Sequence, residues 1–262
     1  MKLSFFKMQA QGNDYLYFDY IGEDLPPIDY AELSKHISDR HYGVGADGIV
    51  LLHSVPDADV GMRIFNADGS EAEMCGSALR SVCGYMGQTK KVDKITVSTL
   101  SGIREGSIEI VKDRMKVKVD MGIPKVLSTN LLIAGTAGIH IDMGNPHFVV
   151  FVDVLPGVSI ADMARPIYQS EHFPQGINVE FVRIDDRSRV TVQVWERGSG
   201  ATLACGTGAC AVAYAGFILD KCDACLDIDL PGGAVKTEYN ETNKHIHLTG
   251  EVVHVFDGTY EW

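Results

Sequence analysis

Two cysteines stand in matching pairs, Cys75-Gly76 and Cys205-Gly206, each where a loop gives way to a stretch rich in Ala, Val and Tyr. A thiol at the start of a helix feels the positive end of the helix dipole, which favours its thiolate form. The unpaired N–H groups of the same first turn bind anions such as a carboxylate. A thiolate and a thiol on opposite faces of one carbon can remove a proton from one side and return one from the other. The pattern therefore predicts a racemase or epimerase in which Cys75 and Cys205 flank the α-carbon of an amino acid.

The segments around the two cysteines are copies of one pattern, which indicates a duplicated structural unit. Two pairs of segments match without gaps at nearly the same spacing along the chain, 66–78 with 196–208 and 11–18 with 143–150. We expect two lobes, residues 1–122 carrying Cys75 and residues 123–262 carrying Cys205. The sequence leaves open whether the extreme C-terminus packs on the first lobe.

Short apolar runs separated by Gly, Asp or Asn predict hairpins, and longer periodic stretches predict helices. The expected fold class is α/β of the α+β type, with two pseudosymmetric lobes of mixed or antiparallel sheet, each wrapped around a central helix. Helices are expected at residues 30–40, 76–89, 160–170 and 206–221. Strands are expected at residues 49–53, 61–65, 93–99, 107–111, 115–120, 190–195, 224–230 and 245–248. Residues 43–48 have the spacing of a dinucleotide-binding loop but follow a helix rather than a strand, so we interpret them as a turn.

Composition and charge restrict the class of partner. Hydrophobic residues make up 45% of the chain and charged residues 22%, which is typical of a globular protein with a sizeable core. The formal net charge of −12 repels nucleic acid and anionic membranes, so a small-molecule ligand is expected. No stretch has the length and apolarity of a membrane span or a secretory leader, so a cytoplasmic location is expected. The sequence leaves open whether the chain forms a homodimer.

The remaining cysteines have weaker claims to a role. Cys83 and Cys210 lie inside two expected helices and are interpreted as core residues. Cys222 and Cys225 have the spacing of a redox or zinc pair, but the chain offers no second ligand pair, so no metal is expected.

Five segments taken in order resemble the diaminopimelate epimerase family, and together they span almost the whole chain. They are Gln11-Gly12-Asn13-Asp14, residues 65–76 ending in Cys75-Gly76, Met143-Gly144-Asn145-Pro146-His147, Gly176-Ile177-Asn178-Val179, and residues 196–208 with Cys205-Gly206-Thr207-Gly208. The resemblance implies two pseudosymmetric lobes that act without pyridoxal phosphate, metal or other cofactor.

The resemblance also implies roles for particular residues. Cys75 and Cys205 match the catalytic bases of the family. Substrate-binding side chains match at Asn13, Asn66, Asn145, Asn178, Glu196 and Arg197, and a carboxylate cradle of backbone N–H groups matches at Gly76, Ser77, Gly206 and Thr207. His147 and Glu196 match positions that adjust the pKa values of the cysteines. On their own, Asn13 is also typical of a turn, His147 of a core and Arg197 of a solvated surface.

The sequence departs from the family pattern at three places near the expected site. Ser77 stands where the family usually has Asn, and Gly48 stands where some members place a side chain near substrate. Residues 9–11, Gln-Ala-Gln, replace a lead-in that commonly contains His. These changes bear on the identity of the substrate more than on the type of reaction.

The two copies differ in a way that favours a substrate with two charged ends. Arg197 aligns with Ala67, and Asn178 aligns with Gly48, so only the second copy carries these polar groups. Such groups could hold the second ammonium and carboxylate of diaminopimelate, and Arg197 would lack an anionic partner with a monocarboxylic amino acid. The expected reaction is epimerisation of LL-diaminopimelate to the meso form, in the synthesis of lysine and peptidoglycan precursors.

Three alternatives remain open. One is a cofactor-independent racemase of another amino acid such as histidine, and another is a two-lobed amino-acid binding protein without chemistry. The third is an isomerase of the phenazine-biosynthesis type, which does not use the cysteine pair. The presence of both cysteines disfavours the third alternative.

Overall fold

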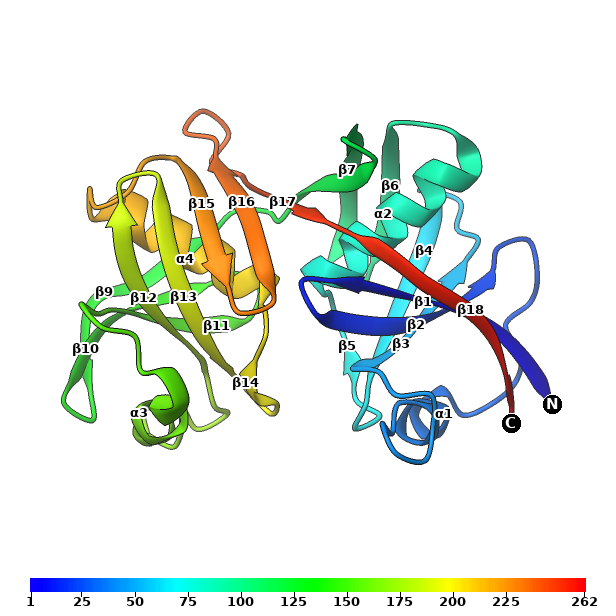
Figure 1. The fold of residues 1–262 in the computed structure, drawn as a ribbon, viewed down its shortest axis with the longest axis horizontal. Helices are drawn as coiled ribbons and strands as arrows, with labels where there is room; N and C mark the ends of the chain where they lie inside the picture. Colours follow the sequence, from blue (N-terminus) through cyan, green and yellow to red (C-terminus); the bar gives the residue numbers. More distant parts are fainter. The chain divides into compact units, whose positions relative to one another are not determined.

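The computed structural model describes residues 1–262 and divides the chain into two compact units. Unit 1 comprises Met1–Val119 together with Gly250–Trp262, and unit 2 comprises Asp120–Thr249 (Figure 1). The division expected after Gly122 falls at Val119, and the C-terminal segment belongs to unit 1.

Unit 1 is a mixed sheet with two helices. Its elements in chain order are β1 (Lys2–Ala10), β2 (Asn13–Tyr20), α1 (Tyr30–Ile37), β3 (Gly48–His53), β4 (Val60–Asn66), β5 (Glu71–Ala72), α2 (Gly76–Lys90), β6 (Lys94–Thr99), β7 (Gly102–Val111) and, after the return of the chain, β18 (Val253–Glu261). Strands β8 (Arg114–Asp120) and β17 (Ile246–Glu251) each run across the boundary between the units. The pairs β2–β3 and β4–β6 are parallel, whereas β1–β2, β1–β18, β3–β4, β6–β7 and β7–β8 are antiparallel.

Unit 2 repeats the same plan. Its elements are β9 (Lys125–Ile133), β10 (Thr136–Asp142), β11 (Pro146–Phe151), η1 (Gly157–Ser159), α3 (Ile160–Tyr168), β12 (Asn178–Asp186), β13 (Arg189–Glu196), β14 (Gly200–Thr202), α4 (Gly206–Ile218), β15 (Cys225–Leu230) and β16 (Gly233–Tyr239). The order β2-α1-β3-β4-β5-α2 in unit 1 corresponds to β11-α3-β12-β13-β14-α4 in unit 2. In both units the first strand pair is parallel and the next is antiparallel. The predicted duplicated mixed sheet is therefore confirmed.

Strand alternation decides which residues face which helix, because successive side chains of a strand point to opposite faces. In β2, Leu16 and Phe18 join the apolar cluster that contains Leu33 of α1. The intervening residue Tyr17 faces the other way and hydrogen-bonds to Ser81 of α2. In β11, Phe148 likewise packs with α3, which leaves His147 on the α4 side of the sheet. Each sheet thus presents its polar positions to the helix that follows a cysteine.

Helices α2 and α4 are the central helices of their units (Figure 1). Helix α4 has buried residues on nearly all sides, from Thr207 to Gly216, as expected of a helix that is apolar all round. Its small residues allow close approach: a Cβ added to Gly208 would lie only 2.6 Å from Glu180 Oε1 on the neighbouring strand. No helix of the chain is both long and apolar enough to cross a membrane.

Candidate active site

Cys75 occupies the N-cap position of α2, as the sequence predicted, and is half-buried. The backbone N–H of Leu79 bonds to the carbonyl of Cys75 at 2.8 Å and so begins the helical ladder. The N–H groups of Gly76 and Ser77 lie one turn earlier, where a helix has no acceptor of its own for them. This first turn has the donors that an anion site needs.

Asn13 lies beside Cys75, and a charged network fixes its orientation. The Cys75 thiol is 3.6 Å from Asn13 Oδ1, and Asn13 Nδ2 donates to Asp47 Oδ2 at 2.8 Å. The guanidinium of Arg40 bridges Asp47 and Asp14 at 2.9 and 2.6 Å. Burial alone would raise the pKa of Asp14, but hydrogen bonds from Arg40 and Lys7 hold it below its ordinary value. Asp14 therefore stays charged, whereas burial, with the charge of Asp14, raises the pKa of Asp47 above its ordinary value. Asp47 Oδ2 accepts from the amide of Asn13 and so holds the Asn13 oxygen toward the thiol.

Tyr15 is a contact of Cys75 that the sequence analysis did not identify. Its side chain is buried and hydrogen-bonds to the Cys75 thiol. Burial, followed by the charge of Cys75, raises the pKa of Tyr15 well above its ordinary range, so the phenol stays protonated and acts as a donor. The ring lies over Gly48, its partner in the β2–β3 pair.

Gly48 has no room for a side chain. A Cβ at this position would lie 2.2 Å from the carbonyl oxygen of Phe65 and 3.0 Å from Cε1 of Tyr15. The departure from the family pattern at Gly48 is therefore a consequence of local packing that includes the Tyr15 ring.

Three further residues of unit 1 were singled out from the sequence. Ser77 is buried in the first turn of α2, where its backbone N–H remains a donor. Asn66 ends β4 and is half-buried, with Nδ2 donating to Ser70 Oγ at 3.0 Å. Gln11, in the atypical lead-in, is buried and accepts from Arg80 at 2.6 Å, so it supports α2 rather than the thiol.

Cys205 occupies the equivalent N-cap of α4 and is 6% exposed. Its sulfur accepts a hydrogen bond from the N–H of Gly208 at 3.4 Å and lies 3.5 Å from Thr207 Oγ1. The expectation that the helix start favours the thiolate is wrong for Cys205, because burial and then the charges of Glu196 and Glu180 raise the pKa of this thiol well above its ordinary value. Cys205 is therefore held as a thiol, the form that donates a proton.

Glu196 contacts Cys205. The carboxylate accepts hydrogen bonds from the Cys205 thiol and, at 2.5 Å, from Thr202 Oγ1. Burial raises the pKa of Glu196 above its ordinary value, although both hydrogen bonds oppose that shift. The arrangement gives the thiol proton a defined acceptor at the end of β13.

Asn145 and His147 form a second group beside Cys205. Asn145 Nδ2 donates to Thr207 Oγ1 at 3.3 Å, and Asn145 Oδ1 lies 3.0 Å from His147 Nε2. The other ring nitrogen of His147, Nδ1, lies 2.7 Å from Glu180 Oε1, and both of these side chains are completely buried. Glu180 was not identified from the sequence. A charged residue in an otherwise apolar strand was the signal that could have found it.

Asn178 and Arg197 lie together at the ends of β12 and β13. Asn178 is buried, donates to the carbonyl of Pro146 at 2.9 Å and accepts from the backbone N–H of Arg197 at 2.9 Å. The Arg197 side chain is exposed and pairs with no carboxylate of the chain. Its guanidinium thus has all of its donors available to a ligand.

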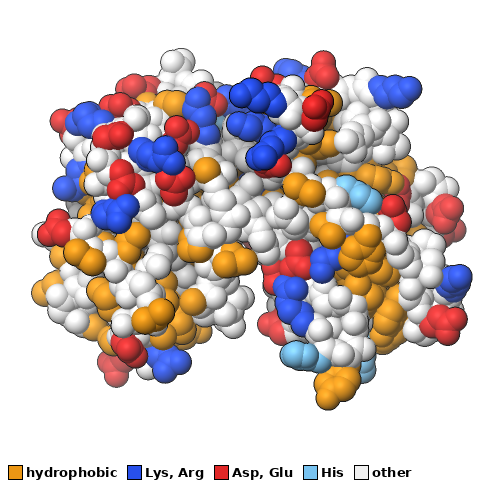
Figure 2. All heavy atoms as spheres, viewed as in Figure 1, with side chains coloured by type: hydrophobic (Ala, Val, Ile, Leu, Met, Phe, Trp, Pro, Cys, Tyr) orange, Lys and Arg blue, Asp and Glu red, His pale blue; other side chains and the backbone are white.

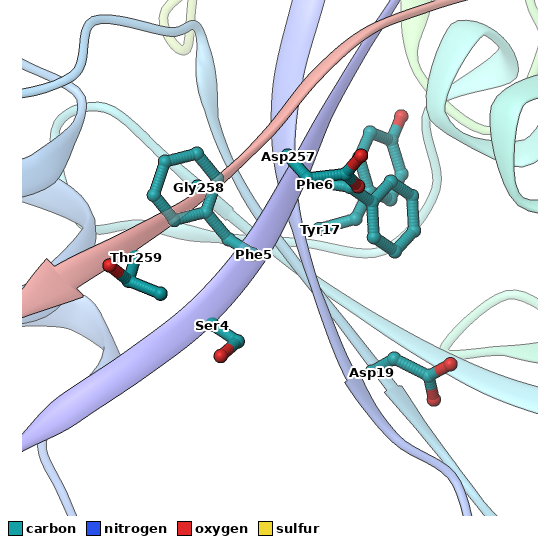
Figure 3. Close-up of a pocket in the computed structure, with 8 residues that line it drawn as sticks. All are labelled: Ser4, Phe5, Phe6, Tyr17, Asp19, Asp257, Gly258 and Thr259. Atoms are coloured by element: carbon teal, nitrogen blue, oxygen red, sulfur yellow. The ribbon is translucent and has the colours of Figure 1, made fainter.

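Two surface hollows of the molecule lie away from these residues. One, of about 510 Å³, is in unit 1, where Figure 3 shows Phe6, Tyr17 and Asp257 gathered on one side of β1 and Phe5 with Thr259 on the other. The other, of about 630 Å³, lies in unit 2 beside the end of α3. Neither hollow is lined by any predicted site residue.

Two of the remaining cysteines lie in the core, as predicted. Cys83 and Cys210 are completely buried, which confirms them as core residues. Cys222 is buried and Cys225 is exposed, and the chain contains no cluster of His, Cys, Asp and Glu suited to a metal ion.

Comparisons with known proteins point to one family. The family model for diaminopimelate epimerase matches residues 5–127 and 139–255. A diaminopimelate epimerase of Methanococcus maripaludis is 39% identical over 275 residues, which cover 98% of this chain and 99% of the relative. One of Parabacteroides distasonis is 42% identical over 265 residues, which cover 98% of this chain and 97% of the relative.

A solved structure shares the fold at low sequence identity. A phenazine biosynthesis protein of the PhzF family from Bacillus anthracis matches with a TM-score of 0.77 at 15% identity, over 100% of both chains. That likeness concerns the fold alone, whereas the sequence matches above extend over almost the entire chain at much higher identity. The chain is therefore an epimerase that belongs to the diaminopimelate epimerase family.

Proposed function

We propose that the protein interconverts LL-diaminopimelate and the meso form, and that Cys75 and Cys205 are the two groups that move the α-proton. The observation that carries the proposal is the duplicated helix start, since each cysteine caps a buried helix in the same place of its unit. Diaminopimelate is the proposed substrate because the chain belongs to the diaminopimelate epimerase family. The reaction would serve the supply of lysine and of peptidoglycan precursors.

The proposed chemistry needs only two protons and no change in oxidation state. The thiolate of one cysteine removes the hydrogen of the substrate α-carbon, and the electron pair of the broken C–H bond delocalises into the carboxylate. The thiol of the other cysteine then protonates the same carbon from the opposite face, which inverts the centre. After one turnover the cysteines have exchanged protonation states. No cofactor is required by this scheme.

The backbone N–H groups of Gly76, Ser77, Gly206 and Thr207 are proposed to hold the carboxylate of the reacting centre. Donors fixed before the reaction stabilise the charge that develops on that carboxylate when the α-proton leaves. The Ser77 departure leaves this role intact, because the backbone donor does not depend on the side chain.

The second end of the substrate is assigned to the polar group of unit 2. Arg197 can bind a carboxylate through two parallel hydrogen bonds, and its guanidinium has no competing partner within the chain. The side chain of Asn178 accepts a hydrogen bond from the backbone N–H of Arg197 and so fixes the position of the Arg197 backbone. Asn13, Asn66, Asn145 and Glu196 are proposed as the remaining polar contacts to the amino acid, with His147 and Glu196 adjusting the thiols.

The proposal is tested by separating stereoisomers after incubation. Purified protein is incubated with LL-diaminopimelate, and the products are resolved by chiral chromatography, with histidine, lysine and alanine in parallel. Conversion of LL-diaminopimelate toward a mixture with the meso form, far faster than racemisation of the other three, is expected. Rapid racemisation of histidine without conversion of diaminopimelate would contradict the proposed substrate but not the two-cysteine mechanism. Binding of the amino acids without conversion of any of them would contradict both the substrate and the mechanism.

We propose that the protein acts in the cytoplasm and that two copies associate through the face of unit 1 crossed by β18. Hydrophobic side chains gather on this part of unit 1 in Figure 2, and Val253, Val255 and Phe256 of β18 are 37%, 49% and 41% exposed. Sedimentation velocity of the wild type and of Phe256→Ser tests the association: a dimer that the substitution weakens is expected, and a monomeric wild type would contradict it.

A further inference from the structure

Unit 2 contains an unbroken chain of hydrogen-bonding groups that runs from a completely buried carboxylate to the thiol of Cys205. The successive separations are 2.7 Å from Glu180 Oε1 to His147 Nδ1, 3.0 Å from His147 Nε2 to Asn145 Oδ1, 3.3 Å from Asn145 Nδ2 to Thr207 Oγ1, and 3.5 Å from Thr207 Oγ1 to Cys205 Sγ. The three intervening groups come from two short segments, β11 with its lead-in and the first turn of α4. Glu180, at the head of the chain, comes from β12.

The two atoms that face the His147 ring favour one arrangement of hydrogens. Glu180 Oε1 faces Nδ1 and Asn145 Oδ1 faces Nε2, and both oxygens are acceptors, so both contacts are hydrogen bonds only when each ring nitrogen carries a hydrogen. The amide of Asn145 then points its Nδ2 at Thr207, whose hydroxyl accepts that bond and is free to donate to the sulfur. A charged imidazole in a buried site requires the opposite charge beside it, which Glu180 supplies.

The thiol of Cys205 lies among three titratable groups from three strands. Glu196 on β13 accepts its hydrogen, Glu180 on β12 adds negative charge, and His147 on β11 lies behind Asn145. Because its own hydrogen is directed to Glu196, the lone pairs of the sulfur can accept hydrogen bonds from Thr207 Oγ1 and from the N–H of Gly208. The backbone N–H of Gly208 can only donate, so the Thr207 bond is the one whose direction depends on how the Asn145 amide is turned.

The repeat shows that the fold itself does not demand a carboxylate at this position. Tyr15 lies opposite Gly48 in unit 1, and His147 lies opposite Asn178 in unit 2, so Gly48 and Asn178 are equivalent positions. Val50 and Glu180 each follow that position by two residues, so Val50 is the counterpart of Glu180. Val50 and Glu180 are both completely buried. A buried carboxylate costs free energy that a valine does not, and Glu180 Oε2 takes no hydrogen bond to offset that cost. The carboxylate must therefore contribute something other than packing.

We propose that Glu180 is a positioning residue of the proposed epimerase reaction, acting on Cys205 through His147, Asn145 and Thr207. It keeps the second hydrogen on the His147 ring, and so keeps the amide of Asn145 and the hydroxyl of Thr207 turned toward the sulfur. Without the carboxylate, His147 holds one hydrogen, Nε2 becomes an acceptor, and Asn145 turns its Nδ2 away from Thr207. The inference rests on the proposed function for its kinetic part only, since the state of the His147 ring is observable without substrate.

The test compares Glu180→Gln, Glu180→Asp and the control Thr237→Val. Thr237 is also a completely buried polar residue of unit 2, but it bonds to the carbonyl of Leu226 and takes no part in the chain. Each full-length protein is labelled with ¹⁵N-histidine, and the ring-nitrogen shifts are recorded without substrate. The protein has nine histidines, so a His147→Gln sample assigns the signal. The kcat and KM for LL-diaminopimelate are measured on the same samples.

The wild type should show both His147 ring nitrogens protonated, and Glu180→Gln should show only one. The kcat of Glu180→Gln should fall about 10- to 100-fold with a smaller change in KM. In metal sites, loss of a carboxylate that orients a histidine lowers activity by about this factor. Glu180→Asp keeps the charge and should retain the doubly protonated ring and more activity, and Thr237→Val should match the wild type in both measurements.

A His147 spectrum that is the same in the wild type and in Glu180→Gln would overturn the proposal, as would an unchanged kcat in that variant. If Glu180→Gln does not fold, a singly protonated His147 ring in the wild type or in Glu180→Asp overturns it equally. Failure of the wild type to convert diaminopimelate would instead overturn the proposed function, and the ring spectra would still decide the role of Glu180.

Discussion

Tyr15 and His147 occupy equivalent positions in the two units, opposite Gly48 in the β2–β3 pair and opposite Asn178 in the β11–β12 pair. Tyr15 donates a hydrogen bond directly to the sulfur of Cys75, whereas His147 contacts Glu180 and Asn145. The duplicated fold therefore surrounds its two thiols with different chemistry. A neutral donor beside one sulfur and carboxylates beside the other suit a reaction in which one cysteine starts as the base and the other as the acid.

Replacement of Tyr15 by Phe should slow the enzyme because the Cys75 thiolate loses a hydrogen bond from a buried donor. A lost bond of about 1.4 kcal/mol corresponds to about a tenfold lower kcat. The rate of alkylation of Cys75 by iodoacetamide, followed by peptide mass spectrometry, should change in parallel. Tyr30→Phe removes a hydroxyl that bonds to the carbonyl of Pro26 and serves as the control with unchanged kcat. Wild-type kcat in Tyr15→Phe would show that the bond does not assist the reaction.

Replacement of Gly48 by Ala should destabilise unit 1, because the added methyl group would overlap the carbonyl oxygen of Phe65 and press on the Tyr15 ring. Overpacking of this kind costs about 1–3 kcal/mol of unfolding free energy. Urea denaturation of the wild type and the variant measures the difference. An equally stable Gly48→Ala protein would mean that the strand pair shifts freely to make room, and packing would then not explain the glycine.

Most of the framework could be predicted because its signals are local. All four longer helices begin at the predicted residue, since each start is marked by a change from loop to apolar pattern. Helix ends were less predictable: α1 ends at Ile37 rather than residue 40, and α4 at Ile218 rather than residue 221. The end of α1 is fixed by bonds from outside the helix, because the N–H groups of Val44 and Gly45 bond to the carbonyl of Ile37.

The parts of the site that escaped prediction depend on contacts between distant segments. Asp47 orients Asn13 although nothing in its own segment marks it as special. Tyr15 and Glu180 become significant only once strand alternation turns them toward α2 and α4. The positions of the cysteines, by contrast, follow from the helix starts that the repeat makes visible. The sequence thus predicts which residues lie on which element, and the structure adds which of them hold one another in place.

Alkaline pH should destabilise the protein through Cys205. Burial first, and then the charges of Glu196 and Glu180, raise the pKa of the native thiol well above its ordinary value of 9.0. Above pH 9 the unfolded chain therefore releases a proton that the native state retains, and unfolding becomes easier. The contribution of this thiol is complete below pH 9 and is lost as the pH rises through the native pKa.

Urea denaturation between about pH 8 and pH 10 checks this dependence. The free energy of unfolding should fall less steeply with pH in Cys205→Ala than in the wild type. Cys225→Ala removes an exposed thiol and should keep the wild-type slope. Equal slopes in all three proteins would mean that Cys205 ionises alike in the native and unfolded states.

Replacement of Arg197 by Ala should weaken the hold on the unreactive end of the substrate. Loss of a charge-assisted hydrogen-bonded pair worth about 1.5–3 kcal/mol corresponds to a KM raised about 10- to 100-fold. The preference for diaminopimelate over histidine and lysine should erode in the same variant. Arg189→Ala removes an arginine from the start of β13 that pairs with Asp229, and its KM should equal that of the wild type. An unchanged KM in Arg197→Ala would place the second carboxylate elsewhere.

The central claim is that Cys75 and Cys205 together exchange the α-proton of one amino acid, and incubation of LL-diaminopimelate in D₂O tests it most directly. Proton NMR follows the α-hydrogen signal with the wild type, Cys75→Ala, Cys205→Ala and the core variant Cys83→Ala. The account predicts that the wild type and Cys83→Ala replace the α-hydrogen with deuterium as the meso form appears. Each of the other two variants should be slower by at least about a hundredfold, the scale of a lost general acid or base. Near wild-type formation of deuterated meso product by either Cys75→Ala or Cys205→Ala would contradict it.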